Sequence, residues 1–120
     1  MNQFSVRTRG STAGPVLELA GDLAYESAPE VRDLLPTLDL EPGQQLLVDL
    51  GGLTFCDSSG ITVLIAARNH ALAAHATLAL AAVPHHVARI LRLVGLEPVL
   101  TTYPTAQDAT ESWIRGTAGS

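Results

Sequence analysis

The sequence contains little cysteine and little positive charge. Cys56 is the only cysteine among the 120 residues, so no disulfide can form within the chain. The formal net charge is −5. An acidic chain lacks the basic stripe by which proteins bind nucleic acid or anionic lipid. We therefore expect a protein partner or a small ligand, with no nucleic acid and no membrane among the partners.

Long apolar runs are also missing. The richest stretch, residues 71–83, is interrupted by His75 and Thr77, and no run reaches the about 18 residues that span a membrane. The N-terminal stretch MNQFSVRTRG lacks the apolar core of a signal peptide. The sequence therefore predicts a cytoplasmic protein. Apolar residues still make up 47% of the chain, which is enough to form the core of one domain.

Strand patterns alternate with helical patterns along the chain, which predicts an α/β fold. An edge strand is expected around Phe4 and Val6, and further strands over residues 16–20, 45–50, 77–83 and 99–100. Helices are expected over residues 27–36, 58–74, 84–94 and 105–114. The inward faces of the second and third helices are predicted from their apolar spacing as Ile61, Leu64, Ile65 and Leu72, and as Val87, Ile90, Leu91 and Val94.

Several residues predict where these elements begin and end. Ser27 with Glu30 has the spacing of a capping box, and Thr105 is expected to cap the last helix. Gly95 stands where a left-handed helix C-cap belongs. Gly21-Asp22 is expected to end the second strand, and Gly51-Gly52 to open a loop after the third.

The most informative segment is Asp57-Ser58-Ser59-Gly60, at the start of the second helix. A helix N-terminus has unpaired amides and a partial positive charge, so it accepts anions. A phosphate on Ser58 or Ser59 would sit in that field, and Asp57 beside it supplies a competing negative charge. Such a site can act as a switch. Asp and Ser are also ordinary cap residues, worth about 1 kcal/mol, and the four residues alone leave both interpretations open.

The Asp-Ser-Ser-Gly segment belongs to a longer pattern of a buried strand, an aromatic residue, this segment and an Ala-rich helix. The pattern extends in order along nearly the whole chain, and the segments that carry it are 21–23, 28–31, 48–50, 55, 57–61, 78–84 and 87–96. It resembles the STAS-domain anti-sigma-factor antagonists. The resemblance implies a single STAS domain over residues 1–114, with a mixed, roughly five-stranded sheet packed by about four helices. Residues 115–120 are expected to form a frayed tail.

The resemblance also implies a bacterial partner switch. The unphosphorylated protein would bind an anti-sigma factor that is a serine kinase, which frees a sigma factor for transcription. The kinase would then phosphorylate Ser58 and eject the protein, and a serine phosphatase would reset it. In this hypothesis the chain is a regulatory protein and not an enzyme, needs no cofactor, and is a monomer or a weak homodimer.

The implied site is centred on Ser58, the position of the family's phosphoacceptor. Asp57 would shape the helix start, Ser59 would help to cap it, and Gly60 would let the partner approach closely. The exposed helix face that contacts the partner would hold Thr62, Ala66 and Asn69. The chain departs from the family at two positions: family members often have Asp where this chain has Ala24, and Gly where it has Thr62.

Other interpretations of these residues stay open. The chain could be a non-phosphorylated STAS scaffold or a transporter-associated subunit, in which residues 57–59 form only a cap and a docking surface. It could also be a small serine hydrolase, if His85 or His86 reached Ser58 as a base, although Gly-x-Ser-x-Gly is absent.

Three further features favour structural roles. Cys56 could be a reactive thiol, but a small buried apolar residue is favoured. Asp49 could be a functional acid, but a hydrogen-bonded carboxylate in a strand is favoured. The four histidines lack the spacing of metal ligands, so no metal site is expected.

Overall fold

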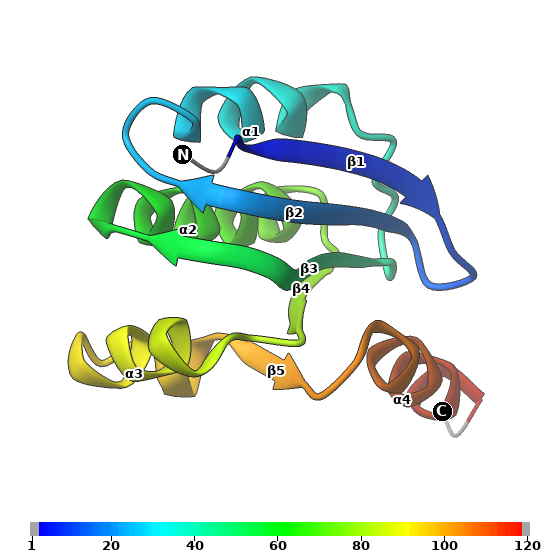
Figure 1. The fold of residues 1–120 in the computed structure, drawn as a ribbon. Helices are drawn as coiled ribbons and strands as arrows, with labels where there is room; N and C mark the ends of the chain where they lie inside the picture. The colour runs from blue at the N-terminus through cyan, green and yellow to red at the C-terminus, as the bar shows by residue number, and fades with distance from the viewer. Residues whose placement is uncertain (1–2, 119–120) are drawn as a thin grey trace.

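The computed structural model describes residues 3–118 and shows strands and helices alternating along the chain (Figure 1). The strands are β1 (Ser5–Gly10), β2 (Pro15–Leu23), β3 (Gln45–Cys56), β4 (Thr77–Ala81) and β5 (Thr101–Tyr103). The helices are α1 (Ala28–Leu34), α2 (Ser58–Ala73), α3 (His85–Leu93) and α4 (Ala106–Ala118). Two short 3-10 turns follow α1 and α3, namely η1 (Leu35–Thr37) and η2 (Glu97–Val99). None of these helices is long and apolar enough to cross a membrane.

The strands form one mixed sheet in the order β1-β2-β3-β4-β5. β1 is antiparallel to β2, and the pairs β2–β3, β3–β4 and β4–β5 are parallel. The parallel strands require crossover connections, which the helices supply. The predicted α/β fold, with a five-stranded mixed sheet and four helices, is therefore confirmed.

Two apolar layers lie on opposite faces of this sheet. Alternate side chains of β2 and β3, such as Leu19 and Val48, pack with α1, α2 and α3 in the main core. The other face packs against α4, where Ala109 meets Val16 and Leu47. α4 covers only part of its face, so the remainder of the sheet is open there (Figure 1).

The prediction that glycines end β2 and β3 is wrong. β2 continues through Gly21, which has φ +88°, and β3 continues through Gly51 and Gly52 to Cys56. The register between the two strands shifts twice in this region, as it does at β-bulges. A Cβ on Gly52 would lie 2.8 Å from Cβ of Ala20, so this glycine permits the close approach of two strands instead of starting a loop.

The capping box predicted at Ser27 is also wrong. Ser27 has helical φ and ψ of −98° and −20°, and its side chain caps no amide of α1. Its hydroxyl donates to the carbonyl of Asp22 at 2.7 Å and accepts from the amide of Ala24 at 2.9 Å. Ser27 therefore closes the loop between β2 and α1.

The helix caps predicted at Thr105 and Gly95 are confirmed. The Thr105 hydroxyl accepts from the amide of Asp108 at 3.0 Å. Gly95 has φ +78°, and the amide of Leu96 donates back to the carbonyl of Leu91 at 2.9 Å, as in a Schellman motif.

Some predicted positions along the chain need correction. Leu72 and Val94, which were predicted to face inward, are 46% and 56% exposed. Val63 is buried instead, and Leu72 and Val94 lie at or next to the last residues of α2 and α3. The last strand lies at 101–103 and not at 99–100, which form part of η2 and its end. α4 continues to Ala118, so residues 115–118 of the predicted frayed tail are helical. Residues 119–120 lie outside the described residues.

Candidate functional site

The candidate site lies where β3 leads into α2. Asp57 is extended, with φ −103° and ψ −169°, and precedes the first helical residue. Its Oδ1 atom accepts hydrogen bonds from the amides of Ser59 at 2.8 Å and Gly60 at 3.2 Å. The carbonyl of Asp57 accepts from the amide of Ile61 at 3.1 Å, which begins the helical ladder. Asp57 therefore shapes the start of α2, as predicted.

Ser58 is the first residue of α2 and is exposed to solvent. Within residues 3–118, no hydrogen bond to its hydroxyl is found, so the oxygen is accessible to an approaching molecule. Its carbonyl accepts from the Thr62 hydroxyl at 2.9 Å. Thr62 and Asn69 are exposed and Ala66 is half-buried, and all three follow Ser58 at spacings that keep them on one helix face.

The two residues after Ser58 each help to form the start of α2. Ser59 contributes its amide to the cap, but its side chain makes no capping bond, because the Asp57 carboxylate already accepts from the first free amides. Gly60 is buried. A Cβ there would lie 2.6 Å from Sγ of Cys56 and 2.8 Å from the carbonyl oxygen of Leu23. Packing beneath the helix thus requires this glycine, and its expected role of letting a partner approach closely stays a prediction.

Cys56 packs under the same turn and is 3% exposed. Burial, with a smaller contribution from the negative charge of Asp57, raises the pKa of its thiol to about 11. The thiol is therefore neutral near neutral pH, and the thiolate is the form that reacts. This supports the interpretation of Cys56 as a buried apolar residue.

Two exposed aromatic side chains flank the site, and neither is among the site residues predicted from the sequence. Tyr25, in the loop between β2 and α1, is 80% exposed, and Phe55, near the end of β3, is 48% exposed. Both line a hollow of about 580 Å³ that Asp57 also lines. The signal available in the sequence was the presence of scarce aromatic residues in or beside loops of a chain that is only 4% aromatic.

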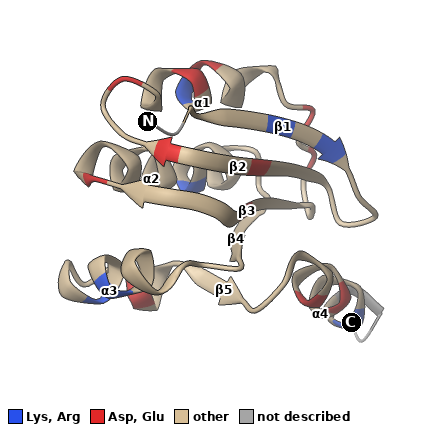
Figure 2. Ribbon diagram, in the orientation of Figure 1, with Lys and Arg blue, Asp and Glu red and all other residues tan. Residues whose placement is uncertain are grey.

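The hollow beside Tyr25 and Phe55 is acidic. Its lining includes the carboxylates of Asp22, Glu26, Glu30 and Asp57, and no Lys or Arg. Figure 2 shows the acidic positions at the end of β2, in the following loop and at the start of α2. Ala24, where the family resemblance predicts a carboxylate, also lines the hollow, and four other carboxylate residues line it beside Ala24.

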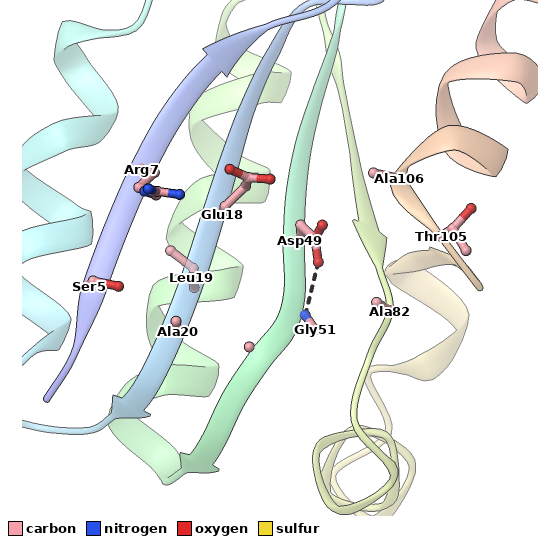
Figure 3. Close-up of a pocket in the computed structure, with 11 residues that line it drawn as sticks. Ser5, Arg7, Glu18, Leu19, Ala20, Asp49, Gly51, Ala82, Thr105 and Ala106 are labelled. Atoms are coloured by element: carbon pink, nitrogen blue, oxygen red, sulfur yellow. Dashed lines mark hydrogen bonds between the residues drawn. The ribbon is translucent and has the colours of Figure 1, made fainter. Parts of the chain in front are cut away.

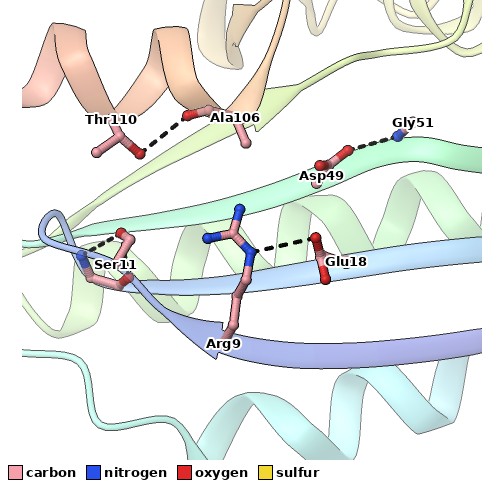
Figure 4. Close-up of polar contacts among 8 residues, drawn as sticks. Arg9, Ser11, Glu18, Asp49, Gly51, Ala106 and Thr110 are labelled. Atoms are coloured by element: carbon pink, nitrogen blue, oxygen red, sulfur yellow. Dashed lines mark hydrogen bonds and ion pairs between the residues drawn. The ribbon is translucent and has the colours of Figure 1, made fainter.

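A second hollow lies on the other face of the sheet, lined by Arg7, Glu18, Asp49 and Thr105 among others (Figure 3). Oδ1 of Asp49 accepts from the amide of Gly51 at 2.9 Å. Arg9 pairs with Glu18 at 3.4 Å across β1 and β2 (Figure 4). Asp49 is thus a hydrogen-bonded carboxylate of a strand, and it faces away from α2 and Ser58.

Residues 3–118 do not show the paired serine and base that a serine hydrolase requires. His85 and His86 are exposed in the first turn of α3, and neither is hydrogen-bonded to Ser58. No group of three or more His, Cys, Asp or Glu side chains that could hold a metal ion occurs in residues 3–118. A hydroxyl nucleophile needs an adjacent base, and neither histidine supplies one to Ser58 in this structure.

Comparison with known proteins gives independent evidence on the family and the fold of this chain. A family model described as "Mlab, STAS domain" matches residues 6–102. No curated protein matches the chain. Solved structures do resemble it, at sequence identities low enough that they establish the fold alone.

Three of these solved structures illustrate how similar their folds and sequences are to this chain. An anti-sigma factor antagonist from Mycobacterium paratuberculosis is 21% identical, with TM-score 0.79, over 92% of this chain and 93% of that chain. The Bacillus cell fate determinant SpoIIAA in its phosphorylated form is 17% identical, with TM-score 0.67, over 92% and 98%. A sulfate transporter family protein from Wolinella succinogenes is 14% identical, with TM-score 0.75, over 88% of each chain.

Proposed function

We propose a function for this chain on the premise that it belongs to the STAS domain family, whose model matches residues 6–102. The resemblance stated from the sequence is thereby confirmed at the level of the family. The function that the site supports best is that of an anti-sigma-factor antagonist whose partner binding is switched by phosphorylation of Ser58. The observation that carries this proposal is the exposed, unengaged Ser58 hydroxyl at the start of α2.

In this proposal the unphosphorylated protein binds an anti-sigma factor that is also a serine kinase, and so releases a sigma factor. Ser58 enters the kinase site because it is the first residue of its helix and is exposed. Transfer moves the γ-phosphoryl group of ATP to the Ser58 oxygen, which loses its proton, and ADP leaves. A serine phosphatase later hydrolyses the phosphate and resets the switch.

The surroundings of Ser58 explain why a phosphate there would break the contact. A phosphate adds about −1.5 to −2 charges at neutral pH. Asp57 is the adjacent residue, and its carboxylate already occupies the amides of Ser59 and Gly60. The new charge therefore gains few hydrogen bonds from the helix start and has to be desolvated if the partner stays bound. Repulsion and desolvation both favour release.

The proposed partner face combines α2 with the aromatic hollow. It includes Ser58 at its centre, Phe55 and Tyr25 on one side, and the α2 face of Ser59, Thr62, Ala66 and Asn69 on the other. Gly60 supports this face from beneath. The aromatic side chains supply apolar contact area, and the carboxylates around them favour a partner with basic residues at its rim.

Phosphopeptide mapping tests the proposal. Protein incubated with ATP and lysate of its own cells is expected to carry a single phosphate on Ser58, and the Ser58→Ala variant is expected to carry none. Ser59→Ala is the matched control for the position of the phosphate, because it keeps the Ser58 hydroxyl and should still carry a phosphate there. With the kinase in hand, Ser58→Ala should bind and fail to be released, while Ser58→Asp should bind more weakly. A well-covered Ser58 peptide that never carries phosphate would overturn the switch.

A second candidate is a non-switching STAS scaffold or transporter-associated subunit. It is favoured by Ala24 and Thr62, the two positions at which the chain departs from the antagonist pattern. Thr62 also places a side chain directly over the Ser58 carbonyl, where a glycine would leave space. In this case Ser58→Ala and Ser58→Asp should bind a partner equally well.

A further inference from the structure

The hollow that Asp57 lines is walled by aromatic side chains. The chain has only one Trp, two Tyr and two Phe, and three of these five residues, Phe4, Tyr25 and Phe55, line the hollow. β2 brings two of them together: a Cβ on Gly21 would lie 3.1 Å from Cα of Phe4, and the next residue, Asp22, pairs with Phe55. Tyr25 and Phe55 are also exposed, so a ligand can reach them. Aromatic faces attract organic cations within about 6 Å.

Four carboxylate residues share the hollow with these aromatic side chains. Asp22, Glu26, Glu30 and Asp57 line it, and none of them forms an ion pair within residues 3–118. Like charges that gather without a counterion repel one another and attract a cation. In the described part of the chain, no group of three or more such side chains could hold a metal ion. The negative charges are therefore spread along the hollow, and they suit an extended cation with several charged groups.

We propose that this hollow binds a small organic polycation of the aliphatic polyamine class. Such a molecule carries ammonium groups at intervals along an apolar chain. Its charges can reach separate carboxylates while its methylene groups and ammonium groups pack on the aromatic rings. The volume of about 580 Å³ lies within the range of small-molecule sites. A single basic side chain of a partner protein would supply one positive charge for four carboxylate residues.

The proposed polyamine site adjoins the proposed switch. Asp57 lines the hollow, and its carboxylate also caps the helix that starts at Ser58. A bound polyamine would cover Tyr25 and Phe55, so it would compete with the anti-sigma factor for the partner face. This competition rests on the proposed function, whereas the binding of the polyamine does not.

NMR titration of the isolated protein with spermidine tests the proposal. Signals of Tyr25 and Phe55 are expected to shift with a Kd of about 0.1 to 1 mM at about 0.15 M salt, since a ligand of this size gains little more binding free energy. The diol 1,8-octanediol is the uncharged control and should not shift these signals. Magnesium chloride at equal ionic strength is the control for charge alone, because Mg²⁺ keeps its water shell and does not stack on aromatic rings.

Two matched double variants test the position of the site. Glu26→Gln with Glu30→Gln removes two carboxylates from the hollow and should raise the Kd for spermidine at least about threefold. Asp39→Asn with Glu97→Gln changes the net charge by the same amount at exposed residues that do not line the hollow. This second double variant should bind spermidine like the wild type.

Exchange of the aromatic side chains tests their contribution. Tyr25→Leu and Phe55→Leu keep an apolar side chain but remove the ring, and each should raise the Kd for spermidine about twofold to fivefold. Circular dichroism checks that the variants are folded. Equal losses for the two double variants, or the same shifts with magnesium chloride, would mean that diffuse charge alone attracts the cation and would overturn the proposal.

Absence of shifts up to about 10 mM spermidine, ten times the weakest expected Kd, would also overturn the proposal. If the Tyr25 and Phe55 signals then shift only with the anti-sigma factor, a partner side chain occupies the hollow, and the proposed function stands without the polyamine site. Conversely, spermidine binding by a protein whose Ser58 never carries phosphate supports the polyamine site and overturns only the switch. The two failures are therefore distinguishable.

Discussion

The Oδ1 atom of Asp57 lies 2.8 Å from the amide nitrogen of Ser59, the second residue of α2. The same oxygen also accepts from the amide of Gly60 at 3.2 Å. This carboxylate fixes the point at which β3 ends and α2 begins, and so determines that Ser58 is the first helical residue. The exposure of Ser58 follows from this cap.

Removing the cap should destabilise the protein without unfolding it. Asp57→Ala leaves the amides of Ser59 and Gly60 without an acceptor and should lower the free energy of unfolding by about 1 kcal/mol. Asp57→Asn keeps an acceptor oxygen and should lower the free energy of unfolding by less than Asp57→Ala does. Urea denaturation measures both changes. Ser59→Ala is the control, because that side chain caps nothing; equal losses for Ser59→Ala and Asp57→Ala would contradict this account.

Gly60→Ala should destabilise the fold, although alanine is the better helix former. Helix propensity alone favours Ala by about 1 kcal/mol. The added Cβ would lie 2.6 Å from Sγ of Cys56 and 2.8 Å from the carbonyl oxygen of Leu23, and overpacking of this kind costs about 1 to 3 kcal/mol. We expect a net loss of stability in thermal or urea unfolding.

The origin of that loss can be tested with two further variants. Gly10→Ala should be tolerated, because no heavy atom beyond its two chain neighbours lies within 4 Å of a Cβ at that position. Cys56→Ala removes the closest atom, so Gly60→Ala should cost less in the Cys56→Ala background than in the wild type. If the cost is the same in both backgrounds, contact with the thiol is not the cause.

The Cys56 thiol should be protected from alkylation and should make the fold sensitive to alkaline pH. Its pKa is raised from 9.0 to about 11, so the folded state holds the proton more tightly than the unfolded chain does. This contribution to stability is fully present below pH 9 and is lost as the pH rises toward 11. Iodoacetamide should react slowly at pH 8 until urea unfolds the protein. Cys56→Ala should show a flatter decline of stability between pH 9 and 11.

The order of elements and the site itself could be predicted from the sequence because they rest on local signals. The start of α2 follows from a capping aspartate followed by apolar residues at helical spacing, and the end of α3 follows from Gly95. These signals act within one turn of the chain. They placed Ser58 at the helix start, which the structure confirms.

The errors lie where contacts between distant segments override local signals. Gly52 resembles a loop glycine in the sequence, yet it lies within β3 because Ala20 of β2 approaches it too closely for a side chain. Ser27 has the spacing of a cap, yet its hydroxyl bonds to Asp22 in the preceding strand. The hollow formed by Tyr25 and Phe55 joins the loop after β2 to the end of β3, 30 residues further along the chain. The scarcity of aromatic residues could have drawn attention to each of the two, but no local pattern shows that they meet.

Tyr25 and Phe55 should contribute to partner binding far more than to stability. Both are exposed, so Tyr25→Ala should change the free energy of unfolding by no more than about 0.5 kcal/mol. In an interface, aromatic side chains often supply more than about 1 kcal/mol each, which corresponds to at least about a fivefold rise in Kd. Calorimetric titration of the kinase identified by Ser58 phosphorylation measures this change.

The control for both aromatic variants is Leu72→Ala, at an exposed apolar residue on the far end of α2, which should leave Kd unchanged. The wild-type complex should also weaken as the salt concentration rises from about 0.05 to 0.5 M. Four carboxylate residues line the hollow, and at the higher salt concentration the screening length is shorter than the hollow is wide, so attraction to a basic partner is screened. Unchanged Kd values for Tyr25→Ala and Phe55→Ala, alongside Ser58 phosphorylation by the same kinase, would restrict the partner face to α2. Such a result would mean that the hollow is not part of the docking surface, because an exposed aromatic side chain that a partner covers cannot be removed without loss of contact area.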